Sequence, residues 1–182
     1  RTPLHVYGMV IAHFGIAVSL AGMASESAFN TEKLVASEIG QAHEVGPWQV
    51  KLDGIAPVAG PNWTALEARL IVSKPGSNQQ IILTPQSRSF SSPPTQTSEA
   101  ALLTRWNGQL YAVLGEEGED GRWQLRLWWK PFVPFIWFGG LLVALGGGLA
   151  LVGRVYRESR RAPLIEDEPA GDVATPLREA HA

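Results

Sequence analysis

The sequence contains no cysteine among its 182 residues. Disulfide bonds, thiol nucleophiles and thiolate metal sites are therefore excluded. The charge balance is nearly even, with 15 Lys and Arg residues against 17 Asp and Glu residues and a formal net charge of -2. This balance offers no electrostatic basis for binding nucleic acid, and we expect no nucleic-acid partner.

The sequence also lacks the motifs of common enzymatic sites. No serine is framed as G-x-S-x-G, and no pair of carboxylates lies in an apolar context. His43 lies beside Glu44, but adjacent side chains of a strand point to opposite faces, which favours a solvated histidine over a metal site. The acidic turn from Glu116 to Gly121 lacks the ligand spacing of a calcium loop. We therefore expect no catalytic residue in this chain.

A long run without Asp, Glu, Lys or Arg opens the chain, from Thr2 to Ser25. As a helix with a rise of about 1.5 Å per residue, this run spans roughly 30 Å, enough to cross a bilayer. We predict a transmembrane helix over residues 1–25. Small residues recur along one side of it at spacings of three and four, which suits close packing against a second helix: Gly8, Ala12, Gly15, Ser19 and Gly22.

His13 lies near the middle of this predicted helix, roughly 140° around the helix axis from the stripe of small residues. Its neighbours on that side are apolar. An ionisable group at membrane depth is costly and is a functional-site hypothesis by default. Two readings stay open: the neutral imidazole bonds to a neighbouring helix, or it ligates a metal or haem iron.

A second uncharged run covers residues 131–153 and is also long enough to span a bilayer. Four arginines follow within eight residues, opposed only by Glu158: Arg154, Arg157, Arg160 and Arg161. The positive-inside rule then places residues 154–182 and Arg1 in the cytoplasm and residues 26–130 on the opposite side, which is the periplasm of a Gram-negative cell. The tail after Arg161 is poor in large apolar residues, so we expect it to be disordered.

The residues around the second run predict how it sits in the membrane. Aromatic residues gather where it begins and predict an interfacial belt: Trp128, Trp129, Phe132, Phe135, Trp137 and Phe138. Glycines within the run predict close helix contact: Gly139, Gly140, Gly146, Gly147 and Gly148.

Residues 26–130 have the two-residue alternation of half-buried β-strands, interrupted by turn signals such as Asn107-Gly108. Strands are predicted near 31–38, 47–57, 63–73, 79–90, 101–106, 109–114 and 122–129. The Ser/Thr/Pro-rich stretch from Ser87 to Ser98 predicts an exposed loop. Short antiparallel strands indicate a small sandwich or partly open barrel, whose tryptophans pack in the core more readily than they stack on haem or face a partner.

The fold class predicted is therefore a membrane protein fragment, in which two transmembrane α-helices flank a small antiparallel all-β domain. The chain begins at Arg1 without an initiator Met, and residues 1–25 lack the charged n-region of a signal peptide. We expect the chain to be a C-terminal piece of a longer membrane protein.

Several sequence blocks, in this order, resemble one family. They are the G-M-x-x-A-H-x-G helix at Gly8–Gly15, the turn Gly60–Trp63, and the segments Leu110–Glu117, Trp123–Leu127, Lys130–Val133, Ile136–Gly140 and Ala144–Gly147. This order resembles the C-terminal region of CcmF, the haem lyase subunit of the bacterial cytochrome c maturation system. The resemblance covers residues 1 to about 160, and the family includes a paralogue dedicated to a cytochrome c nitrite reductase.

The resemblance implies a function in attaching haem to the CXXCH motif of apocytochrome c at the inner membrane. It implies that His13 is an axial ligand of a membrane haem b whose second ligand lies outside this chain. The implied partners are the other maturation subunits, a haem chaperone and apocytochrome c, and this fragment alone is not expected to be catalytic. The alternative is a non-catalytic, membrane-anchored β module that binds a protein partner, in which His13 only packs between helices.

Overall fold

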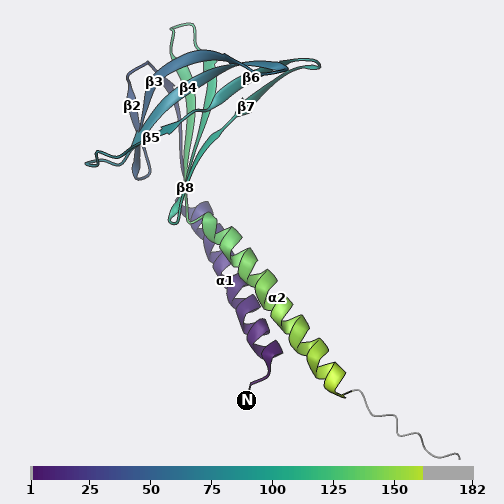
Figure 1. Cartoon of the computed structure of the whole chain (residues 1–182). Helices are drawn as coiled ribbons and strands as arrows, with labels where there is room; N and C mark the ends of the chain where they lie inside the picture. The colour runs from purple at the N-terminus through teal and green to yellow at the C-terminus, as the bar shows by residue number, and fades with distance from the viewer. Residues whose placement is uncertain (1, 162–182) are drawn as a thin grey trace, which may run out of the picture.

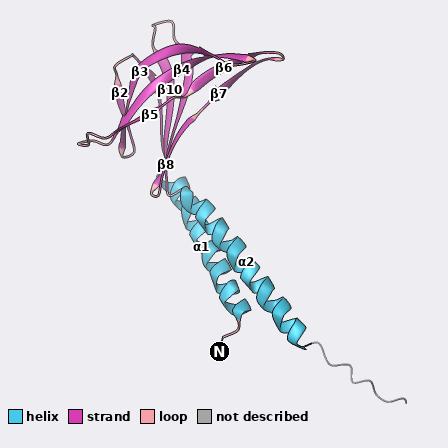
Figure 2. Cartoon of the chain, viewed as in Figure 1, coloured by secondary structure: helices cyan, strands magenta, loops and turns pink. Residues whose placement is uncertain are grey.

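The computed structural model describes residues 2–161, and it divides into a helical stalk and a β domain (Figure 1). Helix α1 (Leu4–Phe29) leads into the domain, and helix α2 (Pro134–Arg161) leaves it. Both helices are long and apolar enough to cross a membrane. All strands lie between the two helices and pair antiparallel (Figure 2). The predicted fold class, two apolar helices flanking an antiparallel all-β domain, is confirmed.

One sheet has four strands in the order β1-β10-β9-β8. Their bounds are Thr31–Ser37 for β1, Trp123–Pro131 for β10, Gly108–Glu117 for β9 and Ala101–Arg105 for β8. The first and last strands of the domain are thus neighbours, with Thr31 opposite Trp129. Because β1 follows α1 and β10 precedes α2, this pairing places the two helices next to each other.

The second sheet has six strands and curls over the first (Figure 2). Its main path is β2 (Ala42–Val45), β3 (Trp48–Ala59), β4 (Trp63–Ser73), β6 (Gln86–Ser91) and β7 (Pro94–Glu99), and β5 (Gln80–Leu83) also pairs with β4. The register shifts between Leu52 and Gly54, and an irregularity of this kind bends a strand. The sheet therefore bends into a half-barrel.

The stretch from Ser87 to Ser98 corrects one prediction. It forms most of the hairpin β6–β7 instead of an exposed loop, with Gln86 paired to Glu99 and Ser91 paired to Pro94. The polar composition is explained by exposure, because every residue of β7 is solvent-exposed. This hairpin is stabilised by backbone pairing with β4 and lacks a buried side that would have produced a hydrophobic alternation.

The core lies between the sheets and consists of the inward-facing residues of the long strands. The completely buried large side chains include Leu52, Leu70, Leu110, Leu114, Leu125 and Leu127. Trp48 and Trp129 are also buried, and their rings meet edge to face with centroids 6.4 Å apart. The prediction of core tryptophans is confirmed for this pair, whereas the prediction of an interfacial belt is wrong for Trp129, which belongs to the β core.

The helix pair is built on glycine. Gly8, Gly15 and Gly22 are the buried residues of α1, and they recur every seven residues, the repeat of helices that wind around each other. On α2, an added Cβ at Gly139 or Gly146 would lie within 2.6 Å of α1 backbone atoms. The predicted small-residue packing is therefore confirmed for these positions.

The other three α2 glycines do not belong to this contact. A Cβ at Gly140, Gly147 or Gly148 would have no described atom within 4 Å, whereas one at Gly153 would lie 2.6 Å from the His5 nitrogen. The prediction of close contact is therefore wrong for Gly140, Gly147 and Gly148 within the described chain, and it missed Gly153.

Candidate functional site

His13 is the candidate ligand, and the structure defines how its ring is held. Its Nδ1 lies 2.8 Å from the backbone oxygen of Met9, one turn earlier in α1. Because a carbonyl oxygen only accepts, Nδ1 carries the hydrogen and donates it. In the neutral imidazole, Nε2 is then left unprotonated, with its lone pair available.

The side chain of His13 points away from α2. It is exposed, whereas Gly8 and Gly15 on the other side of α1 are buried against α2. The neighbours on its side are apolar and also exposed, with Met9 at 51%, Ile16 at 47% and Leu20 at 55%. Apart from Met9, no residue among 2–161 hydrogen-bonds to His13, so α2 does not supply the partner that a purely structural role would require.

The donor set at His13 suits haem better than a free metal ion. Within residues 2–161, no three His, Cys, Asp or Glu side chains come together as a metal site would require. A lone imidazole is a poor site for a bare cation, but haem iron takes its equatorial nitrogens from the porphyrin and needs the protein only for axial ligands. A single His with a fixed tautomer in apolar surroundings therefore fits haem.

His43 has a structural setting. Its Nε2 lies 3.0 Å from Oγ of the buried Ser37, which joins β2 of one sheet to the end of β1 of the other. Burial, and secondarily the charge of Lys33, lowers the pKa of His43 below its ordinary value. The histidine is therefore half-buried and hydrogen-bonded instead of fully solvated, and Glu44 is not part of its contact.

His5 lines an open hollow of about 500 Å³ between α1 and α2, together with Met9, Ala150, Arg154, Arg157 and Glu158. Nε of Arg154 donates to Oε1 of Glu158 at 3.0 Å. This basic hollow lies toward the end of the helix pair that is remote from the β domain. His181 and the predicted disordered tail lie outside the described residues.

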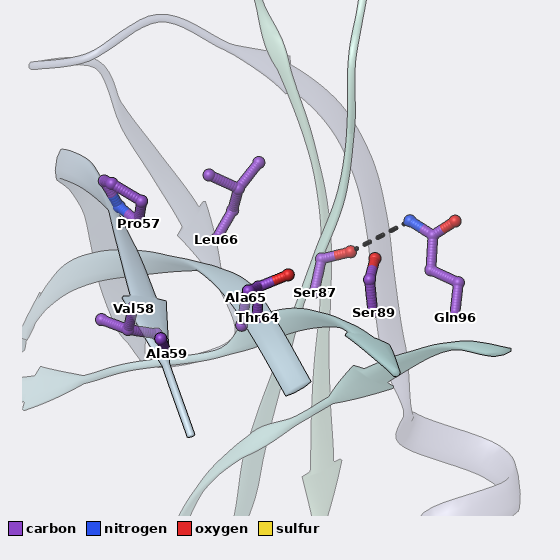
Figure 3. Close-up of a pocket in the computed structure, with 9 residues that line it drawn as sticks. All are labelled: Pro57, Val58, Ala59, Thr64, Ala65, Leu66, Ser87, Ser89 and Gln96. Atoms are coloured by element: carbon purple, nitrogen blue, oxygen red, sulfur yellow. Dashed lines mark hydrogen bonds between the residues drawn. The ribbon is translucent and has the colours of Figure 1, made fainter. Parts of the chain in front are cut away.

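The β domain has a broad hollow of about 400 Å³, shown in Figure 3, besides smaller ones. It lies among β3, β4, β6 and β7 and is lined by Pro57, Val58, Ala59, Thr64, Ala65, Leu66, Ser87, Ser89 and Gln96. Its polar groups are hydroxyls and one amide, and Gln96 Nε2 donates to Ser87 Oγ at 3.4 Å. With no titratable side chain in its lining, this hollow has no acid, base or metal ligand for catalysis.

No sequence pattern marked Trp106 as a candidate functional residue. It lies in the turn between β8 and β9 and is 76% exposed. The turn was predicted from Asn107-Gly108, but nothing in the local pattern indicates that the preceding tryptophan stays outside the core.

The comparisons with known proteins agree with this architecture. Residues 28–131 match the family described as the CcmF C-terminal beta-sandwich, which is more than half of the chain. The chain belongs to this family. Its span of α1, β domain and α2 resembles the C-terminal region of CcmF, as the sequence blocks predicted.

Several relatives extend the match into both helices. The chain is 35% identical to the cytochrome c-type biogenesis protein CcmF of Haemophilus influenzae over 151 residues, 83% of this chain and 23% of that protein. It is 37% identical to the cytochrome c-type biogenesis protein CycK of Bradyrhizobium diazoefficiens over 161 residues, 88% of this chain and 24% of that protein. It is 35% identical to the cytochrome c-type biogenesis protein CcmF of Escherichia coli over 158 residues, 87% of this chain and 24% of that protein.

A solved structure named cytochrome c haem lyase CcmF shares the fold. It matches with a TM-score of 0.65 at 24% identity, over 79% of this chain and 24% of that chain. The chain thus spans about a quarter of the length of the relatives it matches.

Proposed function

We propose that this chain is the C-terminal part of a cytochrome c-type biogenesis haem lyase, which helps attach haem to the CXXCH motif of apocytochrome c. In this proposal His13 is an axial ligand of a haem b in the membrane. The names of the CcmF and CycK relatives support a role in cytochrome c-type biogenesis. The name of the solved structure supports haem attachment as the reaction. The observation that carries the ligand assignment is the bond from His13 Nδ1 to the Met9 carbonyl.

The residues around His13 give it the properties of a ligand. The Met9 carbonyl fixes the ring orientation, as partners of ligating histidines generally do. Met9, Ile16 and Leu20 present apolar surface on the same exposed side of α1. In a membrane this surface would keep water away from a bound haem, whose potential depends on such burial. A haem b bound there would supply the one-electron chemistry that keeps the haem being attached in its ferrous state. The second axial ligand lies outside this chain.

The β domain serves in this proposal as a scaffold or docking surface. We place residues 26–130 in the periplasm and the arginine-rich end of α2 in the cytoplasm of an inner-membrane protein, following the positive-inside rule. The absence of acid, base and ligand groups from the hollow of Figure 3 suits a domain that positions partners. Those partners would be other maturation subunits, a haem chaperone and apocytochrome c.

The test is the substitution His13→Ala in the full-length parent protein purified in detergent. The expected result is loss of the b-type signal from the reduced-minus-oxidised spectrum and a matching loss of haem per protein, with an unchanged gel-filtration profile. Exogenous imidazole should restore part of the signal in His13→Gly, which has room for the added ligand. A packing role would not produce that rescue.

His5→Ala is the matched control, because His5 lies on the same helix two turns away and faces the basic hollow. It should retain the full b-type signal. An unchanged signal in His13→Ala would exclude the ligand assignment and favour the alternative, a membrane-anchored β module without a redox role.

A further inference from the structure

We propose that Trp106 inserts into the headgroup region of a phospholipid bilayer and anchors the β domain to the membrane beside the helix pair. The site is the turn between β8 and β9, and the partner is the phospholipid interface. The inference rests on the proposed function only in that α1 and α2 cross a membrane. It does not depend on haem or on His13.

The exposure of Trp106 is the first observation. At 76%, it exceeds that of every other large apolar side chain among the described residues except Trp137, at 80%. The domain buries the indole rings of Trp48 and Trp129 in its core, whereas the ring of Trp106 stays exposed to solvent. An exposed indole has a large apolar face and one N–H donor, the combination that favours the boundary between headgroups and acyl chains.

The second observation is that the turn is fixed at the level where α2 begins. The backbone N–H of Phe132 donates to the carbonyl of Asn107 at 3.0 Å, and Gly108 pairs with Pro131. Gly108 permits this approach, because a Cβ there would lie 2.6 Å from Trp129 Cζ2 and 2.7 Å from the Lys130 oxygen. Figure 1 shows the lower end of β8 reaching the top of the helix pair. Trp106 therefore cannot change its height relative to α2 without breaking these contacts.

The third observation concerns the ends of the two helices that face the β domain. Phe29 ends α1 with 69% exposure, and Trp137 lies in the first turn of α2. Near these ends, Lys130 Nζ of β10 lies 3.6 Å from Oε1 of Glu26, the last charged residue of α1. Exposed aromatic rings beside the first charges at the end of an apolar helix mark the membrane–water boundary.

These positions define an aromatic collar of Phe29, Trp106 and Trp137. Two of its members come from helices that are long and apolar enough to span a membrane, and the third lies in a turn that bonds directly to the residues just before α2. Arg105 precedes Trp106 and is also exposed, which adds a cation where lipid phosphates lie. A hairpin of the β domain thus becomes a third point of contact with the bilayer, in addition to the two helices.

The test measures the depth of position 106 directly. This chain has no cysteine, so Trp106→Cys in the full-length parent, with any cysteines outside this chain replaced, adds one labelling site here for an environment-sensitive fluorophore. The labelled protein is reconstituted into phosphatidylcholine–phosphatidylglycerol vesicles. Quenching is then compared between a lipid spin-labelled near its headgroup and aqueous iodide.

Two further single-cysteine variants calibrate the result. Trp137→Cys reports the lipid level at the start of α2. Ile39→Cys reports solvent, because Ile39 is 62% exposed in the turn beyond the far end of β1. We expect the lipid quencher to reduce emission at 106 and at 137 several-fold more than at 39.

Quenching at 106 by iodide alone would overturn the proposal, and protection from both quenchers would overturn it in favour of a covering protein subunit. If iodide, and not the lipid quencher, reaches position 137, the membrane topology in the proposed function fails. If 137 is quenched and 106 is not, only the anchor fails. The haem-deficient His13→Ala protein should show the same quenching at 106 as the unsubstituted background.

Discussion

Gly8 of α1 and Gly146 of α2 meet backbone to backbone. A Cβ atom at Gly8 would lie 2.5 Å from the Gly146 oxygen, and one at Gly146 would lie 2.6 Å from the Gly8 oxygen. Both distances are far below van der Waals contact, and the neighbouring atoms are main chain that cannot rotate away. This contact makes the helix pair sensitive to any side chain at either position.

Gly146→Leu should therefore separate or displace the helices, at a cost of about 1–3 kcal/mol or more for overpacking. The measurement is the denaturant midpoint of the protein in detergent, with helix contact followed by cross-linking of cysteines introduced in α1 and α2. Gly147→Leu is the matched control, because a Cβ there meets no described atom within 4 Å. Equal effects of the two substitutions would contradict the glycine-mediated contact.

Leu127→Ala should destabilise the β domain strongly. Leu127 in β10 is fully buried in the core, and removing its side chain should cost about 2–5 kcal/mol because a cavity remains. Leu34→Ala on the adjacent strand β1 is the control, since Leu34 is 60% exposed and should change the unfolding free energy by less than about 0.5 kcal/mol. Urea unfolding followed by tryptophan fluorescence compares the two.

Residues 26–130 expressed alone should fold without haem. The two sheets enclose their own core, and a length of about 100 residues is enough for an independent domain. Far-UV circular dichroism should show a β spectrum with a cooperative melt. A Soret band on the purified domain would contradict the assignment of haem binding to the helical part of the chain.

The stability of this domain should depend on pH through His43. Burial, followed by the charge of Lys33, lowers the pKa of His43 in the folded state, so the unfolded state binds the proton more tightly. The His43 contribution is then complete above the unfolded pKa of about 6.5 and is lost as pH falls from there through the lowered folded pKa. Melting temperatures measured between pH 7.5 and 5 should fall toward acid, and His43→Gln should flatten that fall. An identical pH profile in the variant would exclude His43 as the cause.

The helices were more predictable than the sheets, for a physical reason. Helical periodicity is local, so the spacing of Gly8, Gly15 and Gly22 was enough to predict the packing side of α1. On α2 the glycines lie on two sides, and the sequence does not say which side is used. The structure selects Gly139, Gly146 and Gly153, whose seven-residue repeat matches that of Gly8, Gly15 and Gly22 on α1.

Strand pairing is a long-range property and was less predictable. The alternation of residues 122–129 predicted a strand, but nothing local indicates that Trp129 lies opposite Thr31. Strand β7 was predicted as loop because its residues are all polar apart from Pro94 and all exposed, whereas most of β6 falls within the strand predicted near 79–90. At the candidate site, helical spacing placed His13 away from the stripe, whereas the ring tautomer needed the position of the Met9 carbonyl.

The junction between the stalk and the β domain has a mechanical consequence. Asn30 alone separates α1 from β1, and its N–H still bonds to the Glu26 oxygen at 3.1 Å, while β10 pairs with β1 along its length and leads almost directly into α2. There is no flexible linker at which a rotation of the helices could be absorbed. A tilt of the helix pair is therefore transmitted to the sheets, and the displacement grows with distance along strands that rise about 3.3 Å per residue. An event among the helices would then move the opposite end of the domain, where β9 turns into β10 (Figure 1).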